Sequence, residues 1–202
     1  MDVMKRCAVA ITGASGVVYG LRAVEALLEA GVEVHLVVSE PARLVLAQEQ
    51  GWDERTPLEE ECRRRLRLPT GSKLVVYGNH DIAAPLASGS FGMEAMVVIP
   101  CSMSTLSSIA HGSADSLIER AADVMLKERR PLVLVPRETP LNTIHLRNML
   151  AAAEAGAAIL PAMPAFYHAP ATVEDMVQFV VGKLLDLLRV PHRAFAPYRG
   201  VP

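Results

Sequence analysis

Two short segments of this chain have the residue types and spacing to bind a phosphate. The sequence TGASG at residues 12–16 directly follows one apolar run, and SMST at residues 102–105 follows another. Small and hydroxyl residues at the start of a helix leave backbone N–H groups and hydroxyls available to an anion. The sequence therefore predicts two anion-binding helix starts, each preceded by a buried strand.

Other polar residues also follow apolar runs. Ser39 comes after residues 32–38, and Arg137 comes just after residues 131–135. In open α/β sheets ligands bind beyond the carboxyl ends of the strands, so these residues and the two helix starts should share one edge. A crevice of hydroxyls, small residues and one arginine suits a mononucleotide better than a metal ion.

A group of charged residues could hold a second phosphate. Arg120, Asp123 and Lys127 follow one another at spacings of three and four, which places them on one helix face. Arg137 and Glu138 stand just past a strand that reads as buried. These residues are either a surface ladder of ion pairs or a set of cations for a substrate phosphate, and the spacing leaves both open.

Three other chemistries fit the residues poorly. TGASG also resembles the opening of short-chain dehydrogenases, but Tyr19 stands where that family has a glycine, and no tyrosine is followed by lysine four residues on. The six histidines lack the spacing of a zinc motif, and Ser15 is not in a Gly-x-Ser-x-Gly elbow. We expect no nicotinamide, no metal and no serine nucleophile.

Composition narrows the class of protein. The chain has 202 residues, of which 51% are hydrophobic, and a formal net charge of −2. That charge balance argues against nucleic acid as a partner, and no apolar stretch approaches the roughly 20 residues that span a bilayer. We expect a cytoplasmic protein with three reduced cysteines, and apolar area buried between subunits of an oligomer.

The apolar pattern alternates between strands and helices. The expected strands are residues 8–11, 32–38, 73–77, 95–99, 131–135 and 157–160, and the expected helices are 18–30, 42–50, 56–66, 116–129, 139–155 and 172–188. Such alternation predicts a three-layer α/β fold, flavodoxin-like (Rossmann-type), in which helices cover both faces of a parallel sheet. The Glu- and Arg-rich helix at 56–66 is expected to present a solvated face.

Beyond these patterns, the chain resembles the UbiX-like flavin prenyltransferases from about residue 5 to residue 188. The resemblance rests on TGASG with Tyr19-Gly20, on ASGS at residues 87–90, on Pro100-Cys101-Ser102, on the block from Glu119 to Pro140, and on PAFYH at residues 164–168. It implies transfer of a dimethylallyl group from dimethylallyl phosphate to N5 and C6 of reduced FMN. The product, prenylated FMN, would pass to a UbiD-like decarboxylase.

The resemblance also implies roles for particular residues and an assembly. The expected FMN-binding residues are Gly13, Ala14, Ser15, Ser39, Ser102, Met103, Ser104, Thr105 and Arg137. The expected prenyl-phosphate residues are Arg120, Lys127, Arg137, Glu138, Tyr167 and Lys183, with Ser15, Glu49, Lys127 and Glu138 as catalytic residues and no metal. Relatives of this kind are typically dodecamers with sites at subunit contacts.

Some points stay open at this stage. We expect an FMN-binding domain at residues 1–189 and a tail at 190–202 that lies between subunits or over the site; its Tyr198 replaces a tryptophan frequent in close relatives. The sequence does not separate a monophosphate from a pyrophosphate donor. Two alternative functions remain: a decarboxylase like those that act on phosphopantothenoylcysteine, whose asparagine-containing motif is not visible, and a non-catalytic FMN-binding protein.

Overall fold

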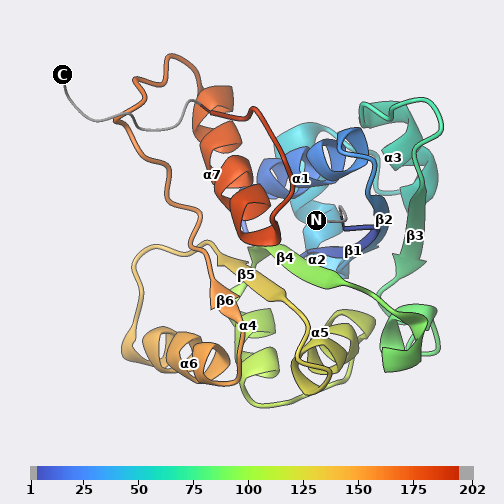
Figure 1. Cartoon of the computed structure of the whole chain (residues 1–202), viewed down its shortest axis with the longest axis vertical. Helices are drawn as coiled ribbons and strands as arrows, with labels where there is room; N and C mark the ends of the chain where they lie inside the picture. The colour runs from blue at the N-terminus through green and yellow to red at the C-terminus, as the bar shows by residue number, and fades with distance from the viewer. Residues whose placement is uncertain (1–3, 196–202) are drawn as a thin grey trace.

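A single parallel sheet organises the chain in the computed structural model, which describes residues 4–195. The strands follow the order β3-β2-β1-β4-β5-β6 across the sheet, and every strand pair is parallel (Figure 1). The bounds are β1 Arg6–Ile11, β2 Glu33–Val38, β3 Leu74–Gly78, β4 Ala95–Cys101, β5 Leu132–Pro136 and β6 Ala158–Ile159. This order reverses between β1 and β4, and such a reversal opens a crevice for a ligand.

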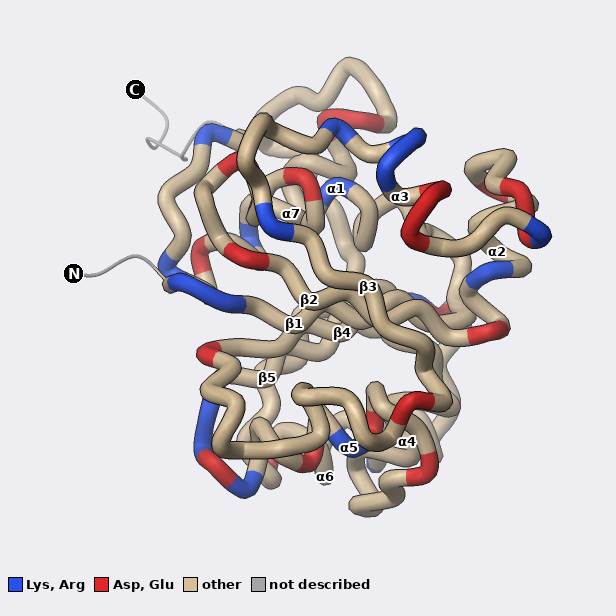
Figure 2. The backbone as a smooth tube through the Cα atoms, turned by 90° about the vertical axis from the view of Figure 1, so that its right-hand side faces the viewer, with Lys and Arg blue, Asp and Glu red and all other residues tan. Residues whose placement is uncertain are grey.

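Helices cover both faces of the sheet. The α-helices are α1 Val17–Glu29, α2 Glu40–Gln50, α3 Leu58–Arg65, α4 Met103–Ala110, α5 Leu117–Lys127, α6 Thr143–Glu154 and α7 Val173–Leu188, and the 3-10 helices are η1 Pro85–Ala87 and η2 Gly89–Phe91. One buried cluster joins α1, α2 and α7 to the sheet, and a second joins α4 and α5 to the other face. Figure 2 shows these two helix layers on either side of the strands. The predicted three-layer fold is confirmed.

The strands alternate in which face they serve. Val9 and Ile11 of β1 belong to the cluster with α1, whereas Ala8 and Ala10 belong to the opposite cluster. All four residues are at most 1% exposed. Burial on both faces explains why β1 reads as a continuous apolar run rather than an alternating one.

Capping residues set the helix starts more closely than the apolar pattern predicted. The helix expected at 139–155 begins only at Thr143, because Asn142 accepts a hydrogen bond of 2.9 Å from the backbone N–H of His145. Thr172 and Ser116 cap α7 and α5 in the same way. The helix α4 was not assigned bounds from the sequence, although its hydroxyl-rich start was recognised.

Two expectations about burial, one for the charged helix and one for the cysteines, have different outcomes. The solvated reading of residues 56–66 is wrong for Glu61, which is 1% exposed and whose carboxylate is paired with Arg64 and Arg65. The three cysteines are free and buried, as expected, and burial raises the pKa of Cys7 and of Cys62 to about 12. Such thiols carry little thiolate at neutral pH and are unreactive.

None of the helices within residues 4–195 combines the length and the apolar composition that a bilayer span needs. Within residues 4–195, no three histidine, cysteine or acidic side chains gather as a group that could hold a metal ion.

Candidate functional site

The carboxyl ends of four neighbouring strands carry the predicted nucleotide-binding residues. In the sheet β2, β1, β4 and β5 lie side by side and point the same way. The polar segments that follow them therefore meet at one edge. These segments begin at Ser39 after β2, Thr12 after β1, Ser102 after β4 and Arg137 after β5. The predicted convergence of four strand ends is present in the structure.

Thr12 joins the ends of β1 and β4. Its hydroxyl donates to the backbone oxygen of Pro100 at 2.7 Å and accepts from the backbone N–H of Ser102 at 2.8 Å. Thr12 is only 1% exposed, so these bonds form away from water. Thr12 is not among the site residues predicted from the sequence, where its one signal is its place directly before the first glycine of TGASG.

The start of α4 is the end best prepared for an anion. Ser102 caps this helix by accepting from the backbone N–H of Thr105 at 3.3 Å, and no acidic residue stands in the first turn. The hydroxyl of Ser102 also lies 3.1 Å from that of Thr105. First-turn amides and two hydroxyls thus surround the positive end of the helix dipole, an arrangement that favours a phosphate.

The start of α1 differs, because a side chain of the protein already covers it. The carboxylate of Glu49 on α2 accepts from the backbone N–H groups of Gly16 at 2.9 Å and Val17 at 3.2 Å. Gly16 has a φ of 92°, in the left-handed region that favours glycine. The sequence predicts an external anion at both helix starts, whereas at the start of α1 the amides of Gly16 and Val17 bind Glu49.

Close backbone approach shapes the crevice between β1 and β2. A Cβ on Gly13 would lie 2.5 Å from Cβ of Pro41, so only glycine fits at this point. Ser39 is buried and caps α2 by accepting from the backbone N–H of Ala42 at 3.3 Å. Its backbone N–H donates to Ile11 at 3.0 Å. Ser39 is therefore a structural cap as well as a member of the crevice wall, and it can supply a ligand with only part of its hydroxyl capacity.

Arg137 is the cation that belongs to this crevice. Its Nε donates a hydrogen bond of 2.9 Å to the backbone oxygen of Ser15, and the Ser15 side chain is exposed. Glu138 is exposed next to it and accepts from the backbone N–H of Thr139 at 2.9 Å. This hydrogen bond holds the Arg137 guanidinium next to the loop that follows β1, at the carboxyl-end edge of the sheet.

Lys127 lies elsewhere in the same chain. Lys127 is the last residue of α5, a few residues before β5 begins, whereas Arg137 and Glu138 follow the end of β5. The length of β5 therefore separates Lys127 from these two residues. Lys127 lies at the amino ends of the strands, and the crevice lies at their carboxyl ends. Its Nζ is 3.2 Å from Oε1 of Glu128. The neighbouring Arg130 donates to the backbone oxygen of Gly89 at 2.9 Å. Lys127 thus stands beside the loop 87–90, not beside Ser15.

Arg120 is exposed and lies about two turns before Lys127 on α5. Among residues 4–195, no ion pair joins Asp123 to Arg120 or to Lys127, so of the two alternatives left open by the spacing the surface ladder does not form. Lys127 pairs instead with the exposed carboxylate of Glu128, its neighbour in the sequence.

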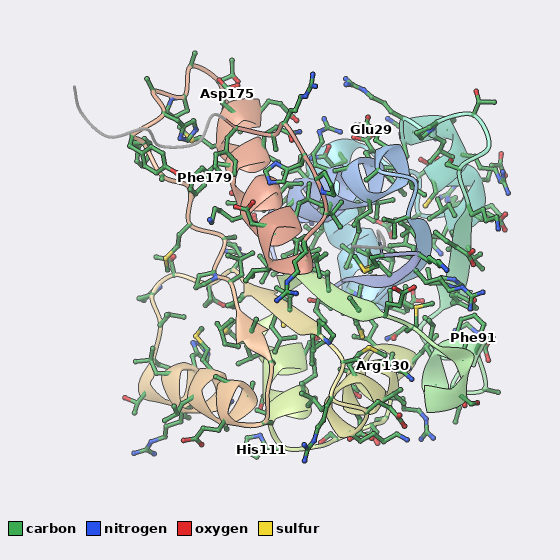
Figure 3. The ribbon with its side chains drawn as sticks, viewed as in Figure 1. Glu29, Phe91, His111, Arg130, Asp175 and Phe179 are labelled. Carbon is green, nitrogen blue, oxygen red and sulfur yellow. The ribbon has the colours of Figure 1, made fainter. Side chains whose placement is uncertain are left out.

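Tyr167 and Lys183 form a third group, on the layer of α7. Figure 3 labels Phe179 on α7 and Arg130 beside α5, on opposite sides of the sheet. The Tyr167 ring packs edge-on against Phe179 with a centroid distance of 5.8 Å, and the Phe195 ring packs against Phe179 at 5.0 Å. Lys183 Nζ lies 6.0 Å from the centroid of the Phe195 ring. Tyr167 and Lys183 therefore border one aromatic cluster.

Fold and site together define a doubly wound α/β protein whose crevice beyond β1 and β4 is suited to a phosphorylated ligand. The family model described as Flavoprotein matches residues 1–185. A flavin prenyltransferase UbiX of Alkalihalophilus pseudofirmus is 50% identical over 193 residues, which cover 96% of each chain.

Solved structures agree with this match. The crystal structure of AnUbiX (PadA1) in complex with FMN and dimethylallyl pyrophosphate superposes with a TM-score of 0.88 at 43% identity, covering 98% of this chain and all of that one. A dodecameric FMN-dependent UbiX-like decarboxylase from Escherichia coli O157:H7 has a TM-score of 0.86 at 42% identity, covering 96% of this chain and all of that one. The chain belongs to the UbiX flavin prenyltransferases of the flavoprotein family.

Proposed function

We propose that this protein transfers a dimethylallyl group from dimethylallyl phosphate to N5 and C6 of reduced FMN, which forms prenylated FMN. The observation that carries the proposal is the near full-length superposition on a relative described in complex with FMN and dimethylallyl pyrophosphate. The chain's own residues fit the flavin nucleotide, since the crevice offers small residues, two hydroxyls and an open helix start. FMN is the substrate of this reaction and acts without a metal.

The protein would hold the FMN phosphate at the start of α4. The amides of Met103 and Ser104 and the hydroxyls of Ser102 and Thr105 lie there, whereas Glu49 covers the start of α1. Gly13 and Ala14 would border the ring system, and Gly13 itself must be a glycine because a Cβ there would collide with Pro41. Arg137 would bind the flavin while its Nε holds the backbone of Ser15 in place.

The proposed reaction joins the prenyl group to the flavin in two steps, first at N5 and then at C6. N5 of the reduced flavin bonds to the first carbon of the prenyl group as its carbon–oxygen bond breaks; the bonding electron pair leaves with phosphate, and N5 loses its proton. The prenyl double bond then takes up a proton, and C6 bonds to the resulting tertiary carbon and loses its own proton. Fixed cations stabilise the departing phosphate, and a water-poor pocket protects the allylic carbon.

Ser15 and Glu49 would move the protons near N5. Glu49 is anchored to the α1 start next to Ser15, so its carboxylate is held within the crevice wall. Arg120, Lys127, Glu138, Tyr167 and Lys183 would surround the prenyl phosphate. Within its own chain, Lys127 lies at the amino ends of the strands, away from the crevice at their carboxyl ends. We therefore propose that Lys127 serves the crevice of a second copy within a dodecamer.

The proposed function also includes the fate of the product and the location of the protein. Prenylated FMN would pass to a UbiD-like decarboxylase that uses it as a cofactor. We further propose a cytoplasmic location, which the lack of any membrane-crossing helix in residues 4–195 supports. The proposed domain covers residues 1–189. Of the tail, Tyr198 lies outside the described residues, and residues 190–195 pack against α7.

Anaerobic incubation of the protein with reduced FMN, dimethylallyl phosphate and a chelator tests the function. Mass spectrometry of the released flavin should show one added five-carbon unit. A parallel reaction with dimethylallyl pyrophosphate identifies the donor. Unmodified FMN in both reactions, with decarboxylation of a cysteine-carboxylate substrate, would instead support the decarboxylase alternative. Flavin binding without either reaction would support a non-catalytic FMN-binding protein.

A further inference from the structure

The carboxylate of Asp186 on α7 is shared between two side chains of different kinds, the ammonium group of Lys183 and the imidazole of His192. Its Oδ2 lies 3.1 Å from Nζ of Lys183, and its Oδ1 lies 3.0 Å from Nε2 of His192. Lys183 and Asp186 are one turn apart on the same helix, whereas His192 belongs to the turn that follows the helix. Lys183, which we place at the prenyl phosphate, is therefore already occupied by a carboxylate of its own chain.

The hydrogen bonds around His192 define which nitrogen carries the proton. Nδ1 accepts from the backbone N–H of Ala194 at 3.2 Å, so the proton of the neutral ring is assigned to Nε2, which donates to Asp186. The His192 side chain is 14% exposed, and this contact is consequently more protected from water than the Lys183 contact, whose side chain is 44% exposed. Asp186 has a fixed partner and an exchangeable one.

The turn after α7 is held close to the helix by packing as well. The ring of Phe195 lies against the helix backbone, and a Cβ on Gly182 would be 2.5 Å from that ring. Phe195 in turn packs on Phe179, next to Tyr167. This packing holds the turn against α7 and keeps His192 within hydrogen-bond distance of Asp186.

We propose that Asp186 is a positioning residue that sets how readily Lys183 can leave it for the phosphate of the prenyl donor, and that His192 tunes this exchange. The inference rests on the proposed function, because it assigns Lys183 to the donor phosphate. An exposed ion pair is weak, so an incoming phosphate competes well for the ammonium group. The hydrogen bond from His192 withdraws charge from Asp186 and so weakens its hold on Lys183.

The two partners of Lys183 should therefore shift donor affinity in opposite directions. Asp186→Asn frees Lys183 and lowers the KM for dimethylallyl phosphate about threefold with little change in kcat, within the range of an exposed pair. His192→Ala leaves Asp186 with Lys183 alone and raises that KM by a similar factor. In a Lys183→Gln background, Asp186→Asn has no effect on KM.

Phe195→Ala removes the packing that holds the turn and the ring beside Lys183, so it should loosen the His192 contact and raise KM as His192→Ala does. If Asp186→Asn, His192→Ala and Phe195→Ala all shift KM in the same direction, or if the Asp186→Asn effect persists without Lys183, the inference is wrong. Glu154→Gln on α6 controls for the loss of one surface charge. Asp186→Ser replaces Asp186→Asn if circular dichroism shows that the first variant does not fold.

Calorimetric titration of the FMN-loaded protein with dimethylallyl phosphate gives the same comparison without turnover. If the parent protein binds the donor and makes prenylated FMN while the Asp186 variants leave KM and Kd unchanged, only this inference fails. If the parent protein neither binds nor converts the donor, the proposed function fails and takes this inference with it.

Discussion

Arg137 and Ser15, which are 122 residues apart in the sequence, are joined by a hydrogen bond of 2.9 Å from the Arg137 Nε to the backbone oxygen of Ser15. The bond ties the end of β5 to the loop after β1, across the intervening end of β4. One side chain thus shapes the glycine loop and contributes charge to the crevice. Its loss should affect ligand binding more than folding.

Replacing Arg137 should weaken FMN binding. A hydrogen bond from a charged donor contributes about 1.5–3 kcal/mol, so we expect Arg137→Ala to raise the Kd for FMN by about tenfold or more. Arg137→Lys keeps the charge but cannot place two donors as a guanidinium does. Its Kd for FMN should therefore lie between that of the parent protein and that of Arg137→Ala. Flavin fluorescence titration measures each Kd. Arg147→Ala, an exposed residue of α6, should bind FMN as the parent does; an unchanged Kd for Arg137→Ala would contradict the assignment.

Glu49 should stabilise the start of α1 in addition to any part in proton transfer. Glu49→Gln removes a negative charge from the helix start and should cost about 0.3–1 kcal/mol of unfolding free energy. Glu49→Ala also removes the acceptor for Gly16 and should cost more. Urea denaturation gives the order of the three proteins. Glu29→Gln, in the last turn of the same helix, should not destabilise the protein, since a negative charge there opposes the helix dipole.

Gly20→Ala should destabilise the protein although it improves helix propensity. Propensity alone predicts a gain of about 1 kcal/mol for this change in a helix. A Cβ at Gly20, however, would collide with the backbone oxygen of Ile99 and with the Ile11 side chain, which forces α1 away from β4. We expect a net loss of about 1–3 kcal/mol, seen as a lower denaturation midpoint. A midpoint above that of the parent protein would show that α1 moves away freely.

Two inactive variants should complement each other if Lys127 serves a neighbouring copy. Lys127→Ala and Glu49→Gln alter opposite edges of one chain, and each alone should lose most of its activity. In mixed oligomers at equal ratio, about a quarter of the sites would combine an intact Lys127 with an intact Glu49. Activity of the co-expressed pair well above that of each variant supports a shared site. The absence of any recovery in mixed oligomers would place both residues in one chain's site.

Stability should fall with falling pH because of His35 on β2. Burial lowers the pKa of His35 below its ordinary value of 6.5, although a hydrogen bond from the ring to Glu33 opposes this shift. Below that ordinary value the unfolded chain takes up a proton that the folded protein does not, so unfolding becomes easier as the pH falls from 6.5 toward the folded pKa. His35→Gln should flatten the slope of unfolding free energy in this window, whereas the exposed His111→Gln should keep it.

The order of the elements and the edge of the sheet that carries the crevice could be predicted from the amino-acid sequence alone. Residues 8–11 and 131–135 are apolar on both faces because strands of a covered parallel sheet are buried on both sides. Polar residues after such runs must meet at one edge in a parallel sheet, so the neighbourhood of Gly13, Ser39, Ser102 and Arg137 could be predicted from local patterns and topology rules alone.

Which polar groups are already paired within the protein depends on how the elements pack, and the sequence pattern does not predict it. Glu49 reaches the amide of Gly16 from 33 residues away, and Glu61 is buried within a segment whose composition reads as solvated. Lys127 and Arg137 are near in sequence, yet β5 carries the chain across the sheet between them and separates their charges. Spacing along a chain reports neighbours on one helix or strand, whereas contacts between elements depend on how those elements pack, and packing is set by the whole core.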